Sequence, residues 1–293
     1  MIRFSKYIAF YFLFSGIFLV VGMYSLVRYG LKQSIDFTGG ALVEMKIADT
    51  TPQSLLEESA KKENMNIASI QKSFEKTYVL RVKPEESEKV NVFFDTVKKT
   101  DNTAELLRRE IVGPILGKEL LTKAIFAAII AMGGILLYVA YAFKNIKFGV
   151  SAIIALFHDL LMVLGVFSLL GHFRGIEVDT LFVTAFLTTM SFSVHDTIVV
   201  FDRIREYLRR GVKLSFEETC DLALTETMGR STTNSLTIIF MLFSLVLLGG
   251  DTVRWFTMAL LVGTISGTYS SPFIATPILI LWDRFERRRK SGT

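Results

Sequence analysis

The sequence predicts an α-helical polytopic membrane protein with six transmembrane helices and a small α+β, ferredoxin-like external domain between the first two helices. Of the 293 residues, 51% are hydrophobic, and the mean hydropathy of +0.44 exceeds that of an ordinary soluble domain. A helix that spans a bilayer needs about 20 apolar residues. Six candidate spans meet this requirement, near residues 7–27, 122–143, 148–170, 180–201, 232–249 and 254–282.

The charge and cysteine content exclude several other classes of protein. The net charge is +5, but Lys and Arg in a membrane protein are first of all topology signals, so this charge does not point to nucleic acid as a partner. The single cysteine, Cys220, excludes an intrachain disulfide and a cysteine-based metal cluster.

The distribution of basic residues predicts the orientation in the membrane. Arg3 and Lys6 precede the first span, which is too long for a signal-peptide core and has no clear cleavage site after it. We therefore expect a retained helix in residues 1–28, an extracytoplasmic domain in 29–120, and five further helices in 121–293. The positive-inside rule places both termini in the cytoplasm. The loops and tail on that side carry Lys144, Lys147, Arg203, Arg205, Arg209, Arg210, Lys213, Arg230 and the basic run 283–293.

The segment between the first two spans has the pattern of a small α+β domain. Alternating apolar residues predict strands, and apolar residues at helical spacing predict helices. Thr51 and Pro52 have the residue types of a helix N-cap and first helical position. The resulting order β-α-β-β-α-β is the ferredoxin-like pattern. The predicted strands are 41–47, 67–74, 77–83 and 105–112, and the predicted helices are 53–64 and 86–99.

Two glycine-containing motifs mark the junctions between this domain and the helices. The first is the run Asp36, Phe37, Thr38, Gly39, Gly40, and the second contains Gly113 and Pro114. A glycine pair permits positive φ angles or close backbone approach, while Gly and Pro interrupt regular structure before the next helix. Either motif alone would also fit an ordinary turn.

Ionisable residues inside the apolar spans are the candidate functional residues. Asp196 follows His195 in the fourth span, and Asp159 follows His158 near the middle of the third. A carboxylate within the membrane is costly and usually marks an ion or proton pathway. The alternative is an aspartate that only hydrogen-bonds a neighbouring helix. The fifth span begins with a polar helical face, which consists of Arg230, Thr233, Asn234 and Thr237.

Three further features of the sequence favour structural roles. Small residues in the sixth span predict a close packing face, and Pro272 and Pro277 predict a kink. Residues 206–230 resemble an interfacial amphipathic helix in which Ser215 and Glu218 would form a capping box. The charged end of the fourth span is interpreted as a solvated helix end held by ion pairs. The packing face is Gly263, Ser266, Gly267, Ser270 and Ser271, and the charged end is Asp202, Arg203, Arg205 and Glu206.

Taken together in order, these motifs resemble the SecF family of bacterial protein export. They are IDFTGG, VGPILGKEL, HD, HDTIVVFDRIRE, RSTTNSLT and SGTYSSPFIATPIL, and they cover nearly the whole chain. His195 is a departure, since Asn is expected there in many relatives. The resemblance implies a six-helix half of an RND-superfamily transporter in the bacterial inner membrane, with SecD as the related half. It further implies use of the proton-motive force in late steps of preprotein translocation through SecYEG, with YajC as another candidate partner.

The same resemblance assigns roles to residues of the spans. Asp196 would be the proton-coupling carboxylate, Arg230 its basic counterpart, and Asp159 a further family position, with the polar residues His195, His158, Thr233, Asn234 and Thr237 in support. An aspartate titrates near pH 4 in water, and burial and a neighbouring cation shift its pKa in opposite directions. Arg stays charged, so the carboxylate must be the switching group. No cofactor and no catalytic activity are expected; the coupling ion is a proton, with Na⁺ as the alternative.

Three other functions remain open at this point. A half of an RND-type exporter of small molecules or lipids would share the helix pattern. An intramembrane aspartyl protease would use paired carboxylates, although the GxGD pattern expected there is absent from the sequence, which has SVHD around Asp196. A passive scaffold of the translocon would need no coupling ion.

Overall fold

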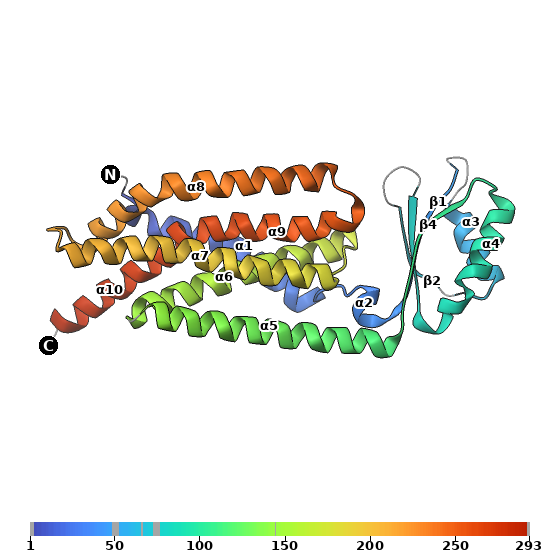
Figure 1. Ribbon diagram of the computed structural model, residues 1–293, viewed down its shortest axis with the longest axis horizontal. Helices are drawn as coiled ribbons and strands as arrows, with labels where there is room; N and C mark the ends of the chain where they lie inside the picture. The colour runs from blue at the N-terminus through green and yellow to red at the C-terminus, as the bar shows by residue number, and fades with distance from the viewer. Residues whose placement is uncertain (1–2, 49–52, 66, 73–76, 144, 292–293) are drawn as a thin grey trace. The chain divides into compact units, whose positions relative to one another are not determined.

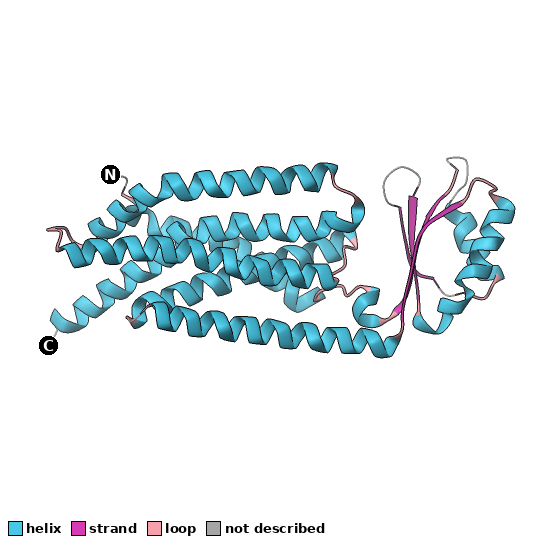
Figure 2. Cartoon of the chain, in the orientation of Figure 1, coloured by secondary structure: helices cyan, strands magenta, loops and turns pink. Residues whose placement is uncertain are grey.

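The computed structural model describes residues 3–48, 53–65, 67–72, 77–143 and 145–291. The chain divides into two compact units, one formed by residues 33–126 and the other by the rest of the chain. In the described part, six helices are long and apolar enough to cross a membrane, while all strands fall within residues 33–126 (Figure 2). The predicted fold class of a multi-pass helical membrane protein is confirmed.

Each of the six predicted spans corresponds to a longer helical segment of the structure. Both termini lie at the end of the bundle that also contains the turn between α7 and α8 (Figure 1). The first span is a 3₁₀ turn, η1 (Phe4–Tyr7), followed by α1 (Ile8–Tyr29). The others are α5 (Pro114–Ala142), α6 (Ile146–Arg174), α7 (Thr180–Arg210), α8 (Phe216–Leu248), and finally α9 (Asp251–Ser270), η3 (Ser271–Ala275) and α10 (Thr276–Ser291).

The prediction of a separate interfacial helix before the fifth span is wrong. Residues 216–248 form one continuous helix, α8, and its start is the predicted capping box. The Ser215 hydroxyl accepts from the Glu218 backbone N–H at 3.2 Å, and the Glu218 carboxylate accepts from the Ser215 backbone N–H at 2.9 Å. The buried residues of the first turns recur at helical spacing, so they pack on the bundle rather than lie on a membrane surface. The apolar ones are Phe216, Cys220, Ala223 and Leu224.

The sixth span is interrupted where Pro272 was expected to kink it. Residues Ser271–Ala275 form a π-helical turn between α9 and α10. Proline has no backbone N–H and cannot continue the α-helical hydrogen-bond ladder, and π turns are a recognised response to such an interruption. The turn is held to α7 by a 2.9 Å hydrogen bond between the hydroxyls of Ser271 and Thr197.

The 33–126 unit has the predicted β-α-β-β-α-β order. Its four strands are all antiparallel and lie in the order β2-β3-β1-β4, which is the split βαβ arrangement of ferredoxin-like domains. The core includes Met45, Leu56, Leu80 and Phe93, each fully buried. The elements are β1 (Gly40–Lys46), α3 (Gln53–Lys62), β2 (Ile67–Lys72), β3 (Thr77–Val82), η2 (Pro84–Lys89), α4 (Val90–Thr100) and β4 (Glu105–Val112).

Two details of this unit differ from or fall outside the prediction. The second helix begins as the 3₁₀ segment η2, with Pro84 at its first position, where the missing N–H costs no intrahelical hydrogen bond. Thr51 and Pro52, the predicted start of the first helix, lie outside the described residues.

The two glycine motifs, in which Gly39 and Gly113 are 74 residues apart in the sequence, pack against each other. A short helix, α2 (Ile35–Thr38), is followed by Gly39 and Gly40 at φ of 75° and 131°. A Cβ on Gly39 would lie 2.8 Å from the Cα of Pro114, and one on Gly117 would lie 2.9 Å from the Gly39 nitrogen. The motifs are therefore glycine-rich because of both positive φ and backbone-to-backbone contact at the start of α5.

Candidate functional site

Asp159 is the most completely hydrogen-bonded carboxylate in the bundle. Its side chain is buried, and four donors from three helices bind its two oxygens. His158 Nδ1 lies 2.9 Å from Oδ1. Serine hydroxyls occupy the remaining positions at 2.6 Å: Ser266 on Oδ1, and Ser193 and Ser270 on Oδ2. An ionised carboxylate has about four acceptor sites, so Asp159 joins α6, α7 and α9 with its acceptor capacity filled.

The histidine next to Asp159 extends this cluster to α1. His158 Nε2 forms a short hydrogen bond with the Ser15 hydroxyl. An ionised carboxylate only accepts, so in that state Nδ1 donates to Asp159 and Nε2 remains for the Ser15 hydroxyl. The buried network therefore includes α1, α6, α7 and α9.

The contacts between α1 and α6 repeat at a constant separation of 143 residues. Ser15 meets His158, and Ser25 meets Ser168 through a 2.8 Å hydrogen bond. Between them a Cβ on Gly165 would lie 2.7 Å from the Cα of Gly22. A constant offset means that the two helices run parallel and stay in register over several turns, as small residues at membrane helix interfaces allow.

Small residues also bring α7 and α9 together around the carboxylate. A Cβ on Gly263 would clash with the Thr189 side chain at 2.1 Å, and one on Gly267 would lie 3.1 Å from the Cα of Ser193. The predicted packing face of the sixth span is thus confirmed. What the sequence did not indicate is that Ser266 and Ser270 of this face donate to Asp159.

Asp196 has a different environment on α7. It is half-buried, and the hydroxyl of Ser231 on α8 lies 2.6 Å and 2.7 Å from its two oxygens. His195, the neighbouring residue, is exposed. Among the residues that the structure describes, Ser231 is thus the one hydrogen-bond partner of the Asp196 carboxylate, and this neutral hydroxyl can bond either oxygen.

The predicted pair of Asp196 and Arg230 is not formed. Arg230 is exposed, and within the described residues its side chain makes no ion pair. On α8 the face toward α7 is that of Ser231 and buried Ser235, four residues apart. The neighbouring face of Arg230, Thr233, Asn234 and Thr237 is exposed, and the Thr233 and Thr237 hydroxyls bond carbonyls of their own helix.

The charged end of α7 is held by ion pairs, as the sequence indicated. Arg203 pairs with Glu226 on α8, and Arg205 lies 3.0 Å from Asp202 and also donates to the Ala142 carbonyl at the end of α5. These contacts tie three helices together near the turn between α7 and α8.

The structure combines a helical membrane bundle, in which Asp159 and Asp196 join neighbouring helices, with a βαββαβ domain that follows the first helix. This combination defines a polytopic membrane protein of transport type. Residues 92–285 match the family described as protein export membrane protein SecD/SecF, C-terminal, and residues 24–50 match the SecD/SecF GG motif. The chain belongs to the SecD/SecF family of protein export membrane proteins.

Relatives of known name agree along almost the full length. The protein translocase subunit SecF of Thermobaculum terrenum is 36% identical over 93% of this chain and 91% of its own. The corresponding subunit of Anaerolinea thermophila is 36% identical over 95% of this chain and 93% of its own. Both are named as subunits of a protein translocase, which places them in protein transport.

A larger relative shows where this chain falls in a longer protein. The protein translocase subunit SecDF of Thermus thermophilus is 32% identical over 89% of this chain but 35% of its own. The crystal structure of a SecDF described as a translocon-associated membrane protein superposes with a TM-score of 0.87 at 28% identity. It covers 97% of this chain and 39% of that one. The fusion makes SecD the expected partner of this chain.

Proposed function

We propose that the chain is the SecF-type accessory subunit of Sec protein export. With SecD, it would couple the proton-motive force to late steps of preprotein translocation through SecYEG in the bacterial inner membrane. Family membership supports the export role. Unfolded preproteins are the substrates of this role, YajC is a further candidate partner, and the basic residues favour cytoplasmic termini with residues 29–120 outside.

The observation that carries the coupling proposal is the bonding of Asp196. A coupling residue must change its charge inside the bundle, so its surroundings must accommodate both states. Ser231 can donate to the ionised carboxylate and accept from the protonated one. One elementary charge moved through 100 mV corresponds to about 2.3 kcal/mol, so a few protons can drive a rearrangement of moderate cost.

The connection between the bundle and the external domain supports transmission of that rearrangement. Asp159 joins α7 and α9 to α6, and α6 is paired in register with α1. Helix α1 is covalently continuous with the glycine motif of residues 34–40, whose backbone contacts the start of α5. A shift of α7 against α8 therefore has a route through α6 and α1 to the 33–126 unit.

Asp196→Asn tests this proposal. Export of a preprotein into inverted membrane vesicles would be measured with ΔpH and the Na⁺ gradient varied independently. The variant should lose gradient-dependent stimulation while expression and SecD association stay at wild-type levels. Asp202→Asn is the matched control, because Asp202 is an exposed carboxylate of the same helix. Normal stimulation in Asp196→Asn would refute the assignment.

The same assay separates the remaining alternatives. Stimulation by Na⁺ alone would make sodium the coupling ion, and stimulation that persists in a collapsed gradient would favour a passive scaffold. An aspartyl protease needs two carboxylates that share a site, whereas Asp159 and Asp196 bind separate sets of serines. The exporter alternative is not favoured, because the matching relatives are named as protein translocase subunits.

A further inference from the structure

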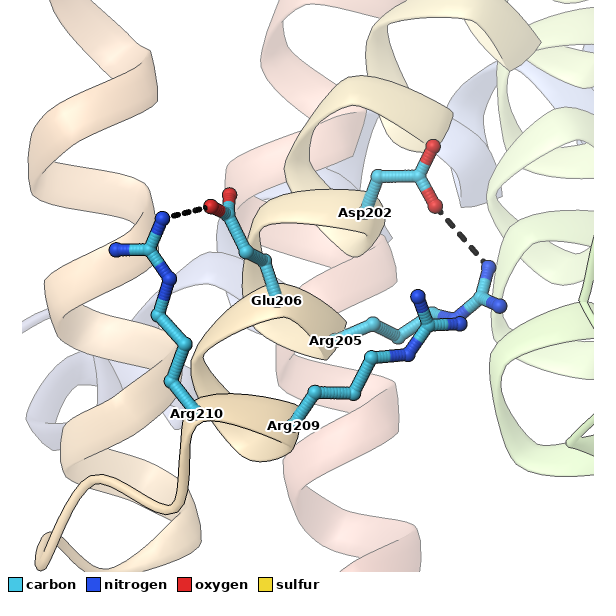
Figure 3. Close-up of a pocket in the computed structure, with 5 residues that line it drawn as sticks. All are labelled: Asp202, Arg205, Glu206, Arg209 and Arg210. Atoms are coloured by element: carbon cyan, nitrogen blue, oxygen red, sulfur yellow. Dashed lines mark hydrogen bonds and ion pairs between the residues drawn. The ribbon is translucent and has the colours of Figure 1, made fainter.

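The end of α7 near the turn to α8 contains a charged pocket that the export function does not use. Three arginines and two carboxylates line it. Figure 3 shows Arg205 and Arg209 directed to one side of the helix, and the ion pair of Arg210 with Glu206 on the other side. Residues 205 and 209 are four apart and share one helical face, so their two guanidinium groups point to the same side of α7.

Both carboxylates of the pocket already have partners. Glu206 accepts from Arg203 and from Arg210, and Asp202 pairs with Arg205. Arg209 is exposed, and its side chain forms no ion pair within the part of the chain that the structure describes. The pocket therefore has positive charge that no residue of its own neutralises.

Arg205 is fixed in place by contacts on several sides. Its Nη1 donates to the Ala142 carbonyl at 3.1 Å and to Asp202 at 3.0 Å, and its guanidinium lies 5.8 Å from the ring centre of Phe143. A guanidinium that is already oriented loses little freedom when it binds an oxyanion in bidentate fashion. Arg205 thus provides a preformed half of an anion site, and Arg209 provides the other half.

The surroundings of the pocket favour a lipid as the source of the anion. The pocket lies at the end of spanning helices, which is the depth of phospholipid headgroups. Next to Ala142 in the chain, Tyr141 is 86% exposed, and Ile146 at the start of α6 is 73% exposed. Exposed Tyr at a helix end is typical of the membrane interface, and exposed apolar side chains next to the segment that Arg205 contacts suit acyl chains. Basic pockets at helix ends are known to take anionic headgroups.

We propose that Arg205 and Arg209 bind the phosphate of an anionic phospholipid headgroup in the leaflet at the end of the bundle that holds both termini. This site would tie the end of α7 to the membrane, independently of which ion drives export. A guanidinium whose charge no carboxylate of the described chain neutralises, such as that of Arg209, contributes enough at a charged lipid surface for about a fivefold change in affinity.

Native mass spectrometry of the purified full-length chain in detergent tests the site. Phosphatidylglycerol and phosphatidylcholine would be titrated separately. The wild type should retain phosphatidylglycerol in preference to phosphatidylcholine, Arg209→Gln should weaken that binding about fivefold, and the double change Arg205→Gln with Arg209→Gln should abolish the preference. Arg210→Gln is the matched control, because its guanidinium pairs with Glu206 on the other side of α7; its binding should stay within twofold of wild type.

Two further arms separate a built site from general attraction to positive charge. Arg209→Lys keeps the charge but removes the bidentate fork, so it should also weaken binding, by at least threefold. Equal losses in Arg209→Gln and Arg210→Gln, or full binding in Arg209→Lys, would overturn the proposal. Displacement of phosphatidylglycerol by an equal concentration of inorganic phosphate would also overturn it, since the site would then recognise a free anion.

Discussion

Asp159 and Asp196 lie on neighbouring helices of one bundle, yet their hydrogen bonding differs. Asp159 is buried and accepts from four donors on three helices. Asp196 is half-buried and accepts from one serine on α8. Four buried donors on three helices depend on the Asp159 carboxylate as their acceptor, so this side chain links the helices through several bonds at once. We therefore propose a structural role for Asp159 and keep the proposed switching role, a change of charge during the export cycle, for Asp196.

The largest expected effect is on stability, which should fall more when Asp159 is replaced than when Asp196 is replaced. Asp159→Ala would leave three serine hydroxyls and the His158 N–H without their buried acceptor, at a cost of about 3 kcal/mol in the free energy of unfolding. Asp196→Ala removes one hydrogen bond at a half-buried position and should cost about 1 kcal/mol. Unfolding of each purified variant in mixed detergent micelles measures the difference. Equal losses of unfolding free energy in the two variants would show that Asp159 and Asp196 contribute equally to stability.

A second substitution tests whether the Asp159 site depends on α1 lying against α6. A Leu at position 165 would place its Cβ 2.7 Å from the Cα of Gly22, so Gly165→Leu should force the helices apart and destabilise the chain by about 2 kcal/mol. Separation of α1 would also break the hydrogen bond between Ser15 and His158.

The matched control for this change lies on α1 itself. A Cβ on Gly16 meets no heavy atom within 4 Å, so Gly16→Leu should be neutral or slightly stabilising, because Leu has a higher helix propensity than Gly. Similar unfolding free energies for Gly165→Leu and Gly16→Leu would show that close approach of the two backbones is not required.

Much of the architecture could be predicted from local patterns. The strand Glu105–Val112 has the predicted bounds. Each span was predicted because an apolar run of about 20 residues is typical of a transmembrane helix. The continuous helix α8 was not predicted, because the amphipathic part 216–230 and the apolar part 232–249 look like separate elements. The capping box predicted the start of α8 correctly. No local pattern indicated that the helix continues without interruption from residue 230 into the apolar part.

The candidate site was predicted less completely, for a physical reason. The carboxylates were found because a charge in an apolar span is visible in the sequence. Their partners depend on helix rotation, which the sequence does not determine. Positions 230 and 231 are about 100° apart around α8, and that single step decides whether an arginine or a serine meets Asp196. Likewise, Ser266 and Ser270 had the spacing of a packing face, which concealed their role as donors.

Removal of one serine hydroxyl at each site should have the smallest effect on stability. It also gives the most direct comparison of the two sites. Ser193→Ala leaves Asp159 with three donors, whereas Ser231→Ala removes the hydroxyl that bonds both oxygens of Asp196. Interhelical hydrogen bonds in membranes contribute about 0.6 kcal/mol each, so both variants should fold. Gradient-dependent export should fall severalfold in Ser231→Ala and stay within twofold of wild type in Ser193→Ala. If Ser193→Ala instead lowers gradient-dependent export more than Ser231→Ala does, Asp159 is the carboxylate that changes charge. The export cycle would then depend on the four-donor site rather than on the hydrogen bond between Asp196 and Ser231.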